Sequence, residues 1–272
     1  MPTHDELKAR AAAAYNAASD AYDAPENTFW DRFGRRTIER LALRPGDRVL
    51  DVCSGSGASA IPAALAVRPT GQVIAIDLAE HLLARLRTRA AGLGLGHLEA
   101  RNGDLLDPPI AGAAAFDAVV CVFGIFFVAD MADAVRRLWS RVAPGGRLAI
   151  TTWGPRLFEP ANGAFWDAVR AVRPDLYKGF SPWDSITSPA SVSALFAAAG
   201  VPDAEVVAEA GAHPLATPEA AWALIMGSGY RGTVEQLSAE DRTSVQARYL
   251  ADLRDLRVTQ VEANVVYATA RR

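Results

Sequence analysis

A glycine turn that follows an apolar strand constrains the fold of this chain more than any other stretch. Residues 48–53 read Arg-Val-Leu-Asp-Val-Cys, and Gly55 and Gly57 come directly after them. Twenty residues beyond Gly57, the apolar run 73–76 ends in Asp77. Glycines let the backbone approach a ligand closely, and an acid at the end of the second strand can accept hydrogen bonds from ribose hydroxyls. The pattern predicts an open parallel sheet that binds a nucleoside.

Two nucleoside cofactors are compatible with these residues. Gly55, Gly57 and Ala60 match the dinucleotide pattern G-x-G-x-x-A, in which the pyrophosphate of NAD(P) lies at a helix N-terminus. Asp51 argues against a pyrophosphate, because a carboxylate at the mouth of the strand would repel it. The same carboxylate suits a ligand with an ammonium group and a sulfonium, such as S-adenosylmethionine. We therefore favour S-adenosylmethionine and keep an NAD(P)-dependent oxidoreductase as the alternative.

Helical and strand patterns alternate along most of the chain, which predicts a doubly wound α/β fold. Parallel neighbours in a sheet need a crossover connection, and helices supply it here. Two helices, 5–23 and 27–43, precede the first strand. The expected strands are 48–53, 72–77, 97–102, 116–122, 146–153 and 203–209, with a β-rich run at 258–270. The expected helices between them are 56–67, 79–92, 130–142 and 189–199.

Four motifs in this order make the chain similar to a known family. They are Asp51 to Gly57, Asp77-Leu78, Gly103-Asp104-Leu105, and the strand 116–124 followed by the turn Pro144-Gly145-Gly146. The chain resembles the class I S-adenosylmethionine-dependent methyltransferases, and more narrowly the small-molecule branch similar to the ubiquinone/menaquinone C-methyltransferases. The resemblance covers about residues 10–210 and the closing strand. Cys53 departs from it, because the family usually has glycine there.

The resemblance implies a Rossmann-like, doubly wound, seven-stranded sheet whose last strand is antiparallel, with helical lid insertions. We divide the chain accordingly into N-terminal helices that cover the cofactor (1–45), a cofactor-binding core (46–153), a lid insertion (154–188), a continuation of the core (189–213), a helical lid insertion (214–256) and the closing strand (257–272).

The residues expected to contact S-adenosylmethionine come from the motifs and from the N-terminal helix, which folds over the cofactor in similar enzymes. They are Tyr15, Tyr22, Asp51, Cys53, Gly55, Gly57, Asp77, Leu78, Asp104, Leu105 and Cys121.

Methyl transfer from a sulfonium is an in-line displacement, so orientation and exclusion of water can supply most of the catalysis. We expect an apolar acceptor beyond the strand ends, since aromatic side chains are dense there. Core packing is about as good an explanation for any single one of them. The adjacent Phe126 and Phe127 cannot both point into one side of a core. The expected acceptor-binding residues are Trp30, Phe123, Phe126, Phe127, Trp153, Trp183, Trp222 and Arg231.

A hydroxyl acceptor would need a general base. His213, just beyond the sixth expected strand, is the nearest candidate by topology, although an exposed loop histidine is the simpler interpretation. Tyr230 is a second candidate for a polar contact with the acceptor. We name His213 and Tyr230 as the catalytic candidates.

The composition and the N-terminal residues limit which partners and which cellular compartment we expect. A formal charge of −3 and a pI near 5.8 argue against nucleic acid. The two cysteines imply no disulfide framework, and the N-terminus has no basic segment followed by an apolar one. We expect a cytoplasmic protein with a small-molecule acceptor, no membrane partner and no metal, which could form a homodimer. A protein that keeps the S-adenosylmethionine pocket without transferring methyl groups is a further alternative.

Overall fold

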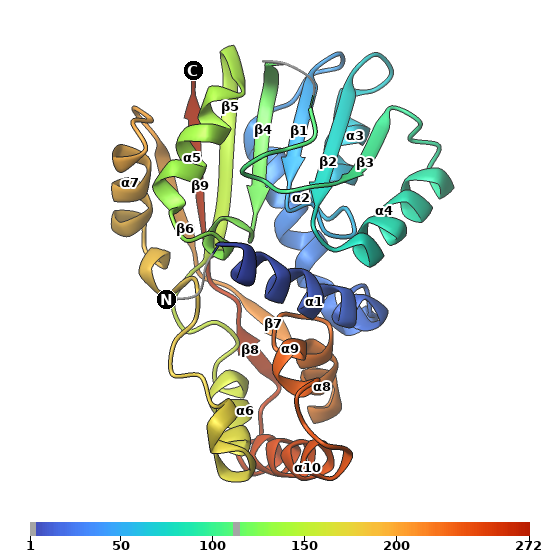
Figure 1. Ribbon diagram of the computed structural model, residues 1–272, viewed down its shortest axis with the longest axis vertical. Helices are drawn as coiled ribbons and strands as arrows, with labels where there is room; N and C mark the ends of the chain where they lie inside the picture. Colours follow the sequence, from blue (N-terminus) through green and yellow to red (C-terminus); the bar gives the residue numbers. More distant parts are fainter. Residues whose placement is uncertain (1–3, 111–114) are drawn as a thin grey trace.

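The computed structural model describes residues 4–110 and 115–272. Within these residues, seven strands form one sheet in the order β3-β2-β1-β4-β5-β9-β6 (Figure 1). The strands are β1 (Arg48–Val52), β2 (Gln72–Asp77), β3 (Leu98–Asn102), β4 (Phe116–Val122), β5 (Val142–Trp153), β6 (Glu205–Glu209) and β9 (Val265–Arg271). Neighbours from β3 to β5 are parallel, whereas β9 runs antiparallel to both β5 and β6. The predicted fold class is confirmed.

The centre of the sheet is apolar on both faces because helices cover both. In β1, Val49, Leu50 and Val52 have no exposed surface, which is typical of a strand buried between two layers. The helices that flank the sheet are α2 (Phe29–Leu41), α3 (Ala60–Val67), α4 (Glu80–Gly92), α5 (Met131–Ser140) and α7 (Pro189–Ala198), while α1 (His4–Tyr22) lies at the edge of the sheet.

Element boundaries differ from the prediction at the glycine turn and at β5. Helix α3 begins at Ala60 instead of residue 56, because Gly57 has a φ of 99° that no helix contains. Strand β5 begins at Val142 and continues through the expected turn at Pro144. A register shift between Phe116 and Ala118 of β4 accommodates this early start.

A second, mainly helical lobe lies beyond the carboxyl ends of the parallel strands, at the bottom of Figure 1. It contains α6 (Ala161–Val172), α8 (Pro218–Met226), α9 (Arg231–Val234) and α10 (Ala239–Asp255), with the antiparallel pair β7 (Ala212–Pro214) and β8 (Gln260–Glu262). Strands β7 and β8 pair with each other, so both join this lobe although we had expected their residues in the core. Helix α1 crosses the edge of the sheet between the two parts (Figure 1).

None of the helices that the structure describes is long and apolar enough to cross a lipid bilayer.

Candidate functional site

A cavity opens at the carboxyl edge of the sheet, under α1. Ligands of open α/β folds bind at this edge. The cavity is lined by Lys8, Ala11, Ala12, Tyr15, Tyr22, Trp30, Cys53, Gly55, Asp77, Leu78, Ala79, Leu82, Gly103, Asp104, Leu105, Val122, Phe123, Phe127 and Val128.

The glycine turn after β1 forms one wall of this cavity. Gly55 has a φ of 53°, and a Cβ there would lie 3.1 Å from the hydroxyl oxygen of Tyr22. Gly57 serves packing instead, because a Cβ at that position would lie 2.4 Å from Cδ1 of Leu86. Cys53 has a φ of 57°, in the left-handed region, which explains why glycine is usual at this position. Gly55 and Cys53 line the cavity, and Gly57 does not.

Asp77, at the end of β2, joins the turn to the start of α4. Its Oδ2 accepts a hydrogen bond from the Gly55 amide at 2.8 Å, and its Oδ1 accepts one from the Ala79 amide at 2.8 Å. Burial raises the pKa of this carboxyl, and the backbone hydrogen bonds oppose that rise. A carboxylate has about four acceptor positions, so Asp77 can still accept hydrogen bonds from a ligand in the cavity.

Asp104 lies after β3 and lines the cavity together with two leucines. Its Oδ1 accepts a hydrogen bond from the Leu106 amide at 3.0 Å, and its Oδ2 lies 3.2 Å from Nζ of Lys8. Leu78 and Leu105 also line the cavity, so apolar side chains accompany this carboxyl group. A flat ring with an amino group suits such a lining chemically.

Asp51 lies behind the glycine turn and not at the mouth of the cavity. It is fully buried, and its Oδ2 accepts a hydrogen bond from Oγ of Ser59 at 2.7 Å. Its Oδ1 has no hydrogen-bond partner in the described part of the chain. Burial raises the pKa of this carboxyl to about 7. The expected direct contact with a cationic ligand is therefore absent from the cavity wall that the structure describes, although the unpartnered oxygen is a free acceptor below the turn.

The second cysteine also lies behind the wall. Cys121 is fully buried on β4, where it pairs with Val52 of β1, and its thiol is hydrogen-bonded to that of Cys53. Neither cysteine is in a disulfide. Cys121 therefore supports Cys53 from below and does not line the cavity.

Five aromatic side chains line the cavity. They are Tyr15, Tyr22, Trp30, Phe123 and Phe127. The rings of Tyr22 and Trp30 are stacked, with centroids 4.9 Å apart, and Tyr15 meets Phe127 edge to face at 5.7 Å. Of the adjacent pair, Phe127 faces the cavity, while Phe126 is buried against Phe127 and Trp183, so at least one does face the pocket as predicted.

The remaining expected acceptor residues lie outside the cavity. Trp153 is stacked beneath Phe123, with centroids 3.7 Å apart, so it supports the wall from behind. Trp222 packs against Tyr249 in the lower lobe. Arg231 binds Glu235 through Nε at 2.5 Å. For Phe126, Trp153, Trp183 and Trp222 the alternative of core packing describes their positions better than contact with a ligand.

Neither catalytic candidate lies at the cavity. His213 is buried on β7, where its Nε2 donates a hydrogen bond to the Glu26 carbonyl at 2.6 Å and its ring packs against Phe29. Burial lowers the pKa of this imidazole. Tyr230 donates a hydrogen bond through its hydroxyl to Asn162 at 2.7 Å, within the lower lobe. Neither residue lines the cavity, and their role as a base or a polar contact with the acceptor stays a prediction.

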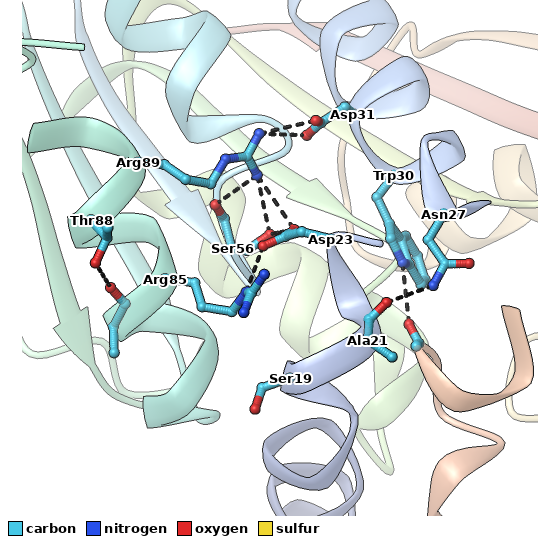
Figure 2. A network of polar contacts seen from close by, with 12 residues as sticks. Ser19, Ala21, Asp23, Asn27, Trp30, Asp31, Ser56, Arg85, Thr88 and Arg89 are labelled. Atoms are coloured by element: carbon cyan, nitrogen blue, oxygen red, sulfur yellow. Dashed lines mark hydrogen bonds and ion pairs between the residues drawn. The ribbon is translucent and has the colours of Figure 1, made fainter. Parts of the chain in front are cut away.

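Figure 2 shows a polar network that fixes the glycine turn to the end of α1. Asp23 accepts a hydrogen bond from Oγ of Ser56 and forms an ion pair with Arg85 at 2.7 Å. Arg89 contacts Ser56 at 3.2 Å and pairs with Asp31 at 3.0 Å. The turn, the end of α1 and the start of α2 are therefore held in one arrangement by α4.

Sequence reasoning missed the first turns of α1. Lys8, Ala11 and Ala12 line the cavity together with Tyr15. Lys8, Tyr15 and Tyr22 are spaced by seven residues, which places them on one face of a helix, so the expected role of both tyrosines could have led to Lys8.

In the part of the chain that the structure describes, no group of three or more His, Cys, Asp or Glu residues could hold a metal ion.

Comparison with known proteins agrees with this geometry. Residues 49–146 match the family model described as "Methyltransferase domain". The chain is 34% identical over 137 residues to the nocamycin O-methyltransferase of Saccharothrix syringae, covering 50% of this chain and 49% of that protein. It is 34% identical over 140 residues to the ubiquinone/menaquinone biosynthesis C-methyltransferase UbiE of Pseudomonas entomophila, covering 51% and 53%. The chain thus spans about half the length of the curated relatives it matches.

Among solved structures, phosphoethanolamine N-methyltransferase 2 of Haemonchus contortus, in complex with S-adenosyl-L-methionine, aligns with a TM-score of 0.56 and 17% identity. The alignment covers 99% of this chain and 58% of that one. This likeness shows the fold. The resemblance to class I methyltransferases, predicted from four motifs, is confirmed by the family match and the relatives.

Proposed function

We propose that this chain binds S-adenosylmethionine in the cavity and transfers its methyl group to a small apolar or aromatic acceptor. The observation that carries the proposal is the arrangement of the cavity walls. Two acids on neighbouring strand ends, Asp77 and Asp104, line the cavity together with five aromatic side chains. The names of the relatives, which methylate oxygen or carbon, support the same class of reaction.

The residues of this chain fit the cofactor. Asp77 would hold the ribose hydroxyls, while Leu78, Asp104 and Leu105 would hold the adenine. Gly55 leaves space that a Cβ would fill, so the methionine part can pass close to the backbone below Tyr22. The unpartnered Oδ1 of Asp51 is an acceptor behind the same turn. When bound, S-adenosylmethionine supplies an electrophilic methyl group on a sulfonium.

The aromatic end of the cavity would orient the acceptor and exclude water. Trp30, Phe123 and Phe127 present apolar surface, and Val122 and Val128 extend it. A flat or lipophilic acceptor gains from burial against such a wall. Holding the acceptor atom in line with the methyl group can account for several kcal/mol of the barrier without any proton transfer.

The chain's own hydroxyl groups would act as hydrogen-bond donors and not as bases. Burial raises the pKa of both Tyr15 and Tyr22 well above its ordinary value, so both phenols stay protonated at neutral pH. We therefore propose metal-independent transfer that relies on positioning, with Tyr15 and Tyr22 as polar contacts near the transferred group.

The contacts of the glycine turn disfavour the dinucleotide alternative. A pyrophosphate needs free backbone N–H groups at the turn and at a helix start. Here the Gly55 amide already donates to Asp77, whose carboxyl faces the same cavity. A diphosphate at this position would meet an acid where it needs a donor.

Calorimetric titration with S-adenosylhomocysteine, NAD and NADP tests the cofactor. We expect heat of binding with S-adenosylhomocysteine alone. Incubation with S-adenosylmethionine and an extract-derived pool of small aromatic compounds then tests turnover, which we expect to yield S-adenosylhomocysteine and a product heavier by one methyl group. Binding without turnover across the pool would support the non-methylating alternative, and binding of NAD(P) in its place would refute the proposal.

A further inference from the structure

Helix α1 is attached firmly at its C-terminal end and lightly at its N-terminal end. From Asp5 to Ala14 no residue is buried, whereas Ala18 and Tyr22 are. Asn16 accepts a hydrogen bond from the His81 amide at 3.0 Å, and Asp23, just after the helix, belongs to the network of Figure 2. The C-terminal end of α1 is thus fixed to α4 by both packing and polar contacts.

The first turns of α1 nevertheless cover the cavity. Lys8, Ala11, Ala12 and Tyr15 lie on one face of the helix and line the cavity with it. Alanine side chains bury little apolar area, so they hold this part of the helix only weakly. Polar contacts therefore matter more for holding the first turns of α1 over the cavity than for holding its last turns in place.

Lys8 makes such a contact across the cavity. Its Nζ lies 3.2 Å from Oδ2 of Asp104, and the Asp104 side chain is only 15% exposed. The hydrogen bond and the charge of Asp104 raise the pKa of Lys8. Lys8 also lies 3.6 Å from Asp5, but that carboxyl is 89% exposed and one helical turn away on α1 itself, so it cannot tie the helix to the sheet.

We infer that Lys8 is a positioning residue that holds the N-terminal half of α1 closed over the adenosine end of the cavity through Asp104, and so sets how fast the cofactor and its product exchange. The part that concerns exchange of the cofactor and its product rests on the proposed function, because Asp104 is the carboxyl proposed to hold adenine. A carboxylate oxygen has two lone pairs and can accept from Lys8 and from an amino group together. Closure and cofactor binding then use the same carboxyl.

Hydrogen exchange in the ligand-free protein tests closure without any cofactor. In Lys8→Met, the amides of residues 9–14 should exchange about twofold to fivefold faster than in the wild type, the range expected for a partly exposed ion pair. Lys8→Arg should restore slow exchange, since arginine also binds a carboxylate. Arg10→Met, the matched control, removes a cation from the same half of the helix at an exposed residue that does not line the cavity, and should leave exchange unchanged. Equal exchange in Lys8→Met and the wild type would overturn the inference, and so would failure of Lys8→Arg to restore it.

Dissociation of S-adenosylhomocysteine, followed by tryptophan fluorescence, tests the second part. We expect about twofold to fivefold faster release from Lys8→Met and normal release from Lys8→Arg. Raising the ionic strength should speed release from the wild type and not from Lys8→Met, because salt screens the ion pair. Unchanged release from Lys8→Met would refute the role in exchange. Failure of the wild type to bind S-adenosylhomocysteine would instead refute the proposed function, while the exchange of α1 amides would still report on closure.

Discussion

Gly124 faces Cys53 across the ends of β4 and β1, so closely that a Cβ on Gly124 would lie 2.4 Å from Cβ and 2.5 Å from Sγ of Cys53. Cys53 stands where related enzymes usually have glycine, and it has a φ of 57°. The Cys53 side chain therefore fits because residue 124, opposite it, is a glycine. A larger residue at either position requires a small residue at the other.

We predict that Gly124→Ala lowers the free energy of unfolding by about 1–3 kcal/mol, because the added methyl group overlaps Cys53 in a packed region. Adding Cys53→Gly should restore most of the loss, since it removes the overlapping atoms and glycine suits the left-handed backbone. Urea unfolding of the wild type, both single variants and the double variant measures the coupling.

Gly92→Ala is the matched control, because nothing lies within 4 Å of a Cβ there. It should not destabilise the protein. A Gly124→Ala variant as stable as the wild type would contradict the size dependence, and so would a double variant no more stable than Gly124→Ala.

The sheet could be predicted because its signals are local. In strand β2 the apolar run 73–76 is continuous and ends at Asp77, and Asp104 follows β3, at the edge where parallel strands end together. The order of the strands alone was therefore enough to predict that Asp77 and Asp104 lie at one cavity. The exact start of α3 could not be predicted, because G-x-G-x-x-A does not reveal that Gly57 is held by packing against Leu86.

The strand pair of the lower lobe could not be predicted, because long-range pairing forms it. His213 pairs with Val261 between β7 and β8, which are three residues each and too short to show a strand pattern. A histidine before a proline therefore resembled a loop residue. The contact between Tyr230 and Asn162 of α6 could not be predicted for the same reason, since the two residues are far apart in sequence.

Asp77→Ala should weaken binding of S-adenosylhomocysteine by about 1–3 kcal/mol, through loss of buried hydrogen bonds to ribose and of the contacts that hold Gly55 and Ala79. Calorimetry measures the change. The exposed Asp107 offers a control, and Asp107→Ala should bind as the wild type does. Unchanged affinity in Asp77→Ala would remove this acid from the cofactor site.

Asp51 should make stability depend on pH. Its pKa is raised from 3.8 to about 7, so between these values the folded protein holds a proton that the unfolded chain has released. Stability contributed by this group is therefore present below pH 4 and falls as pH rises towards 7. Asp51→Asn removes the ionisation and keeps an acceptor for Ser59. The unfolding free energy of Asp51→Asn minus that of the wild type should rise with pH across this window, and a constant difference would contradict the assignment.

His213 is expected to stabilise the lobe without taking part in methyl transfer. His213→Phe should lower the free energy of unfolding by about 0.5–1.5 kcal/mol, because it removes the hydrogen bond to the Glu26 carbonyl. Its pKa is lowered from 6.5 by burial, so below pH 6.5 the unfolded chain binds a proton that the folded chain does not, and stability falls with acid. His213→Phe should lose that acid dependence, measured by urea unfolding at several pH values.

The same variant separates the structural role of His213 from a chemical one. Affinity for S-adenosylhomocysteine and the rate of methyl transfer, measured where His213→Phe is fully folded, should equal those of the wild type, because His213 lies outside the cavity and its Nε2 already donates to Glu26. If transfer fell by more than about tenfold at unchanged affinity, a loss of about 1.4 kcal/mol in the transition state, His213 would have to act on the acceptor after a movement of the lobe. An unchanged rate together with lower stability assigns the imidazole to the junction between β7 and the segment before α2.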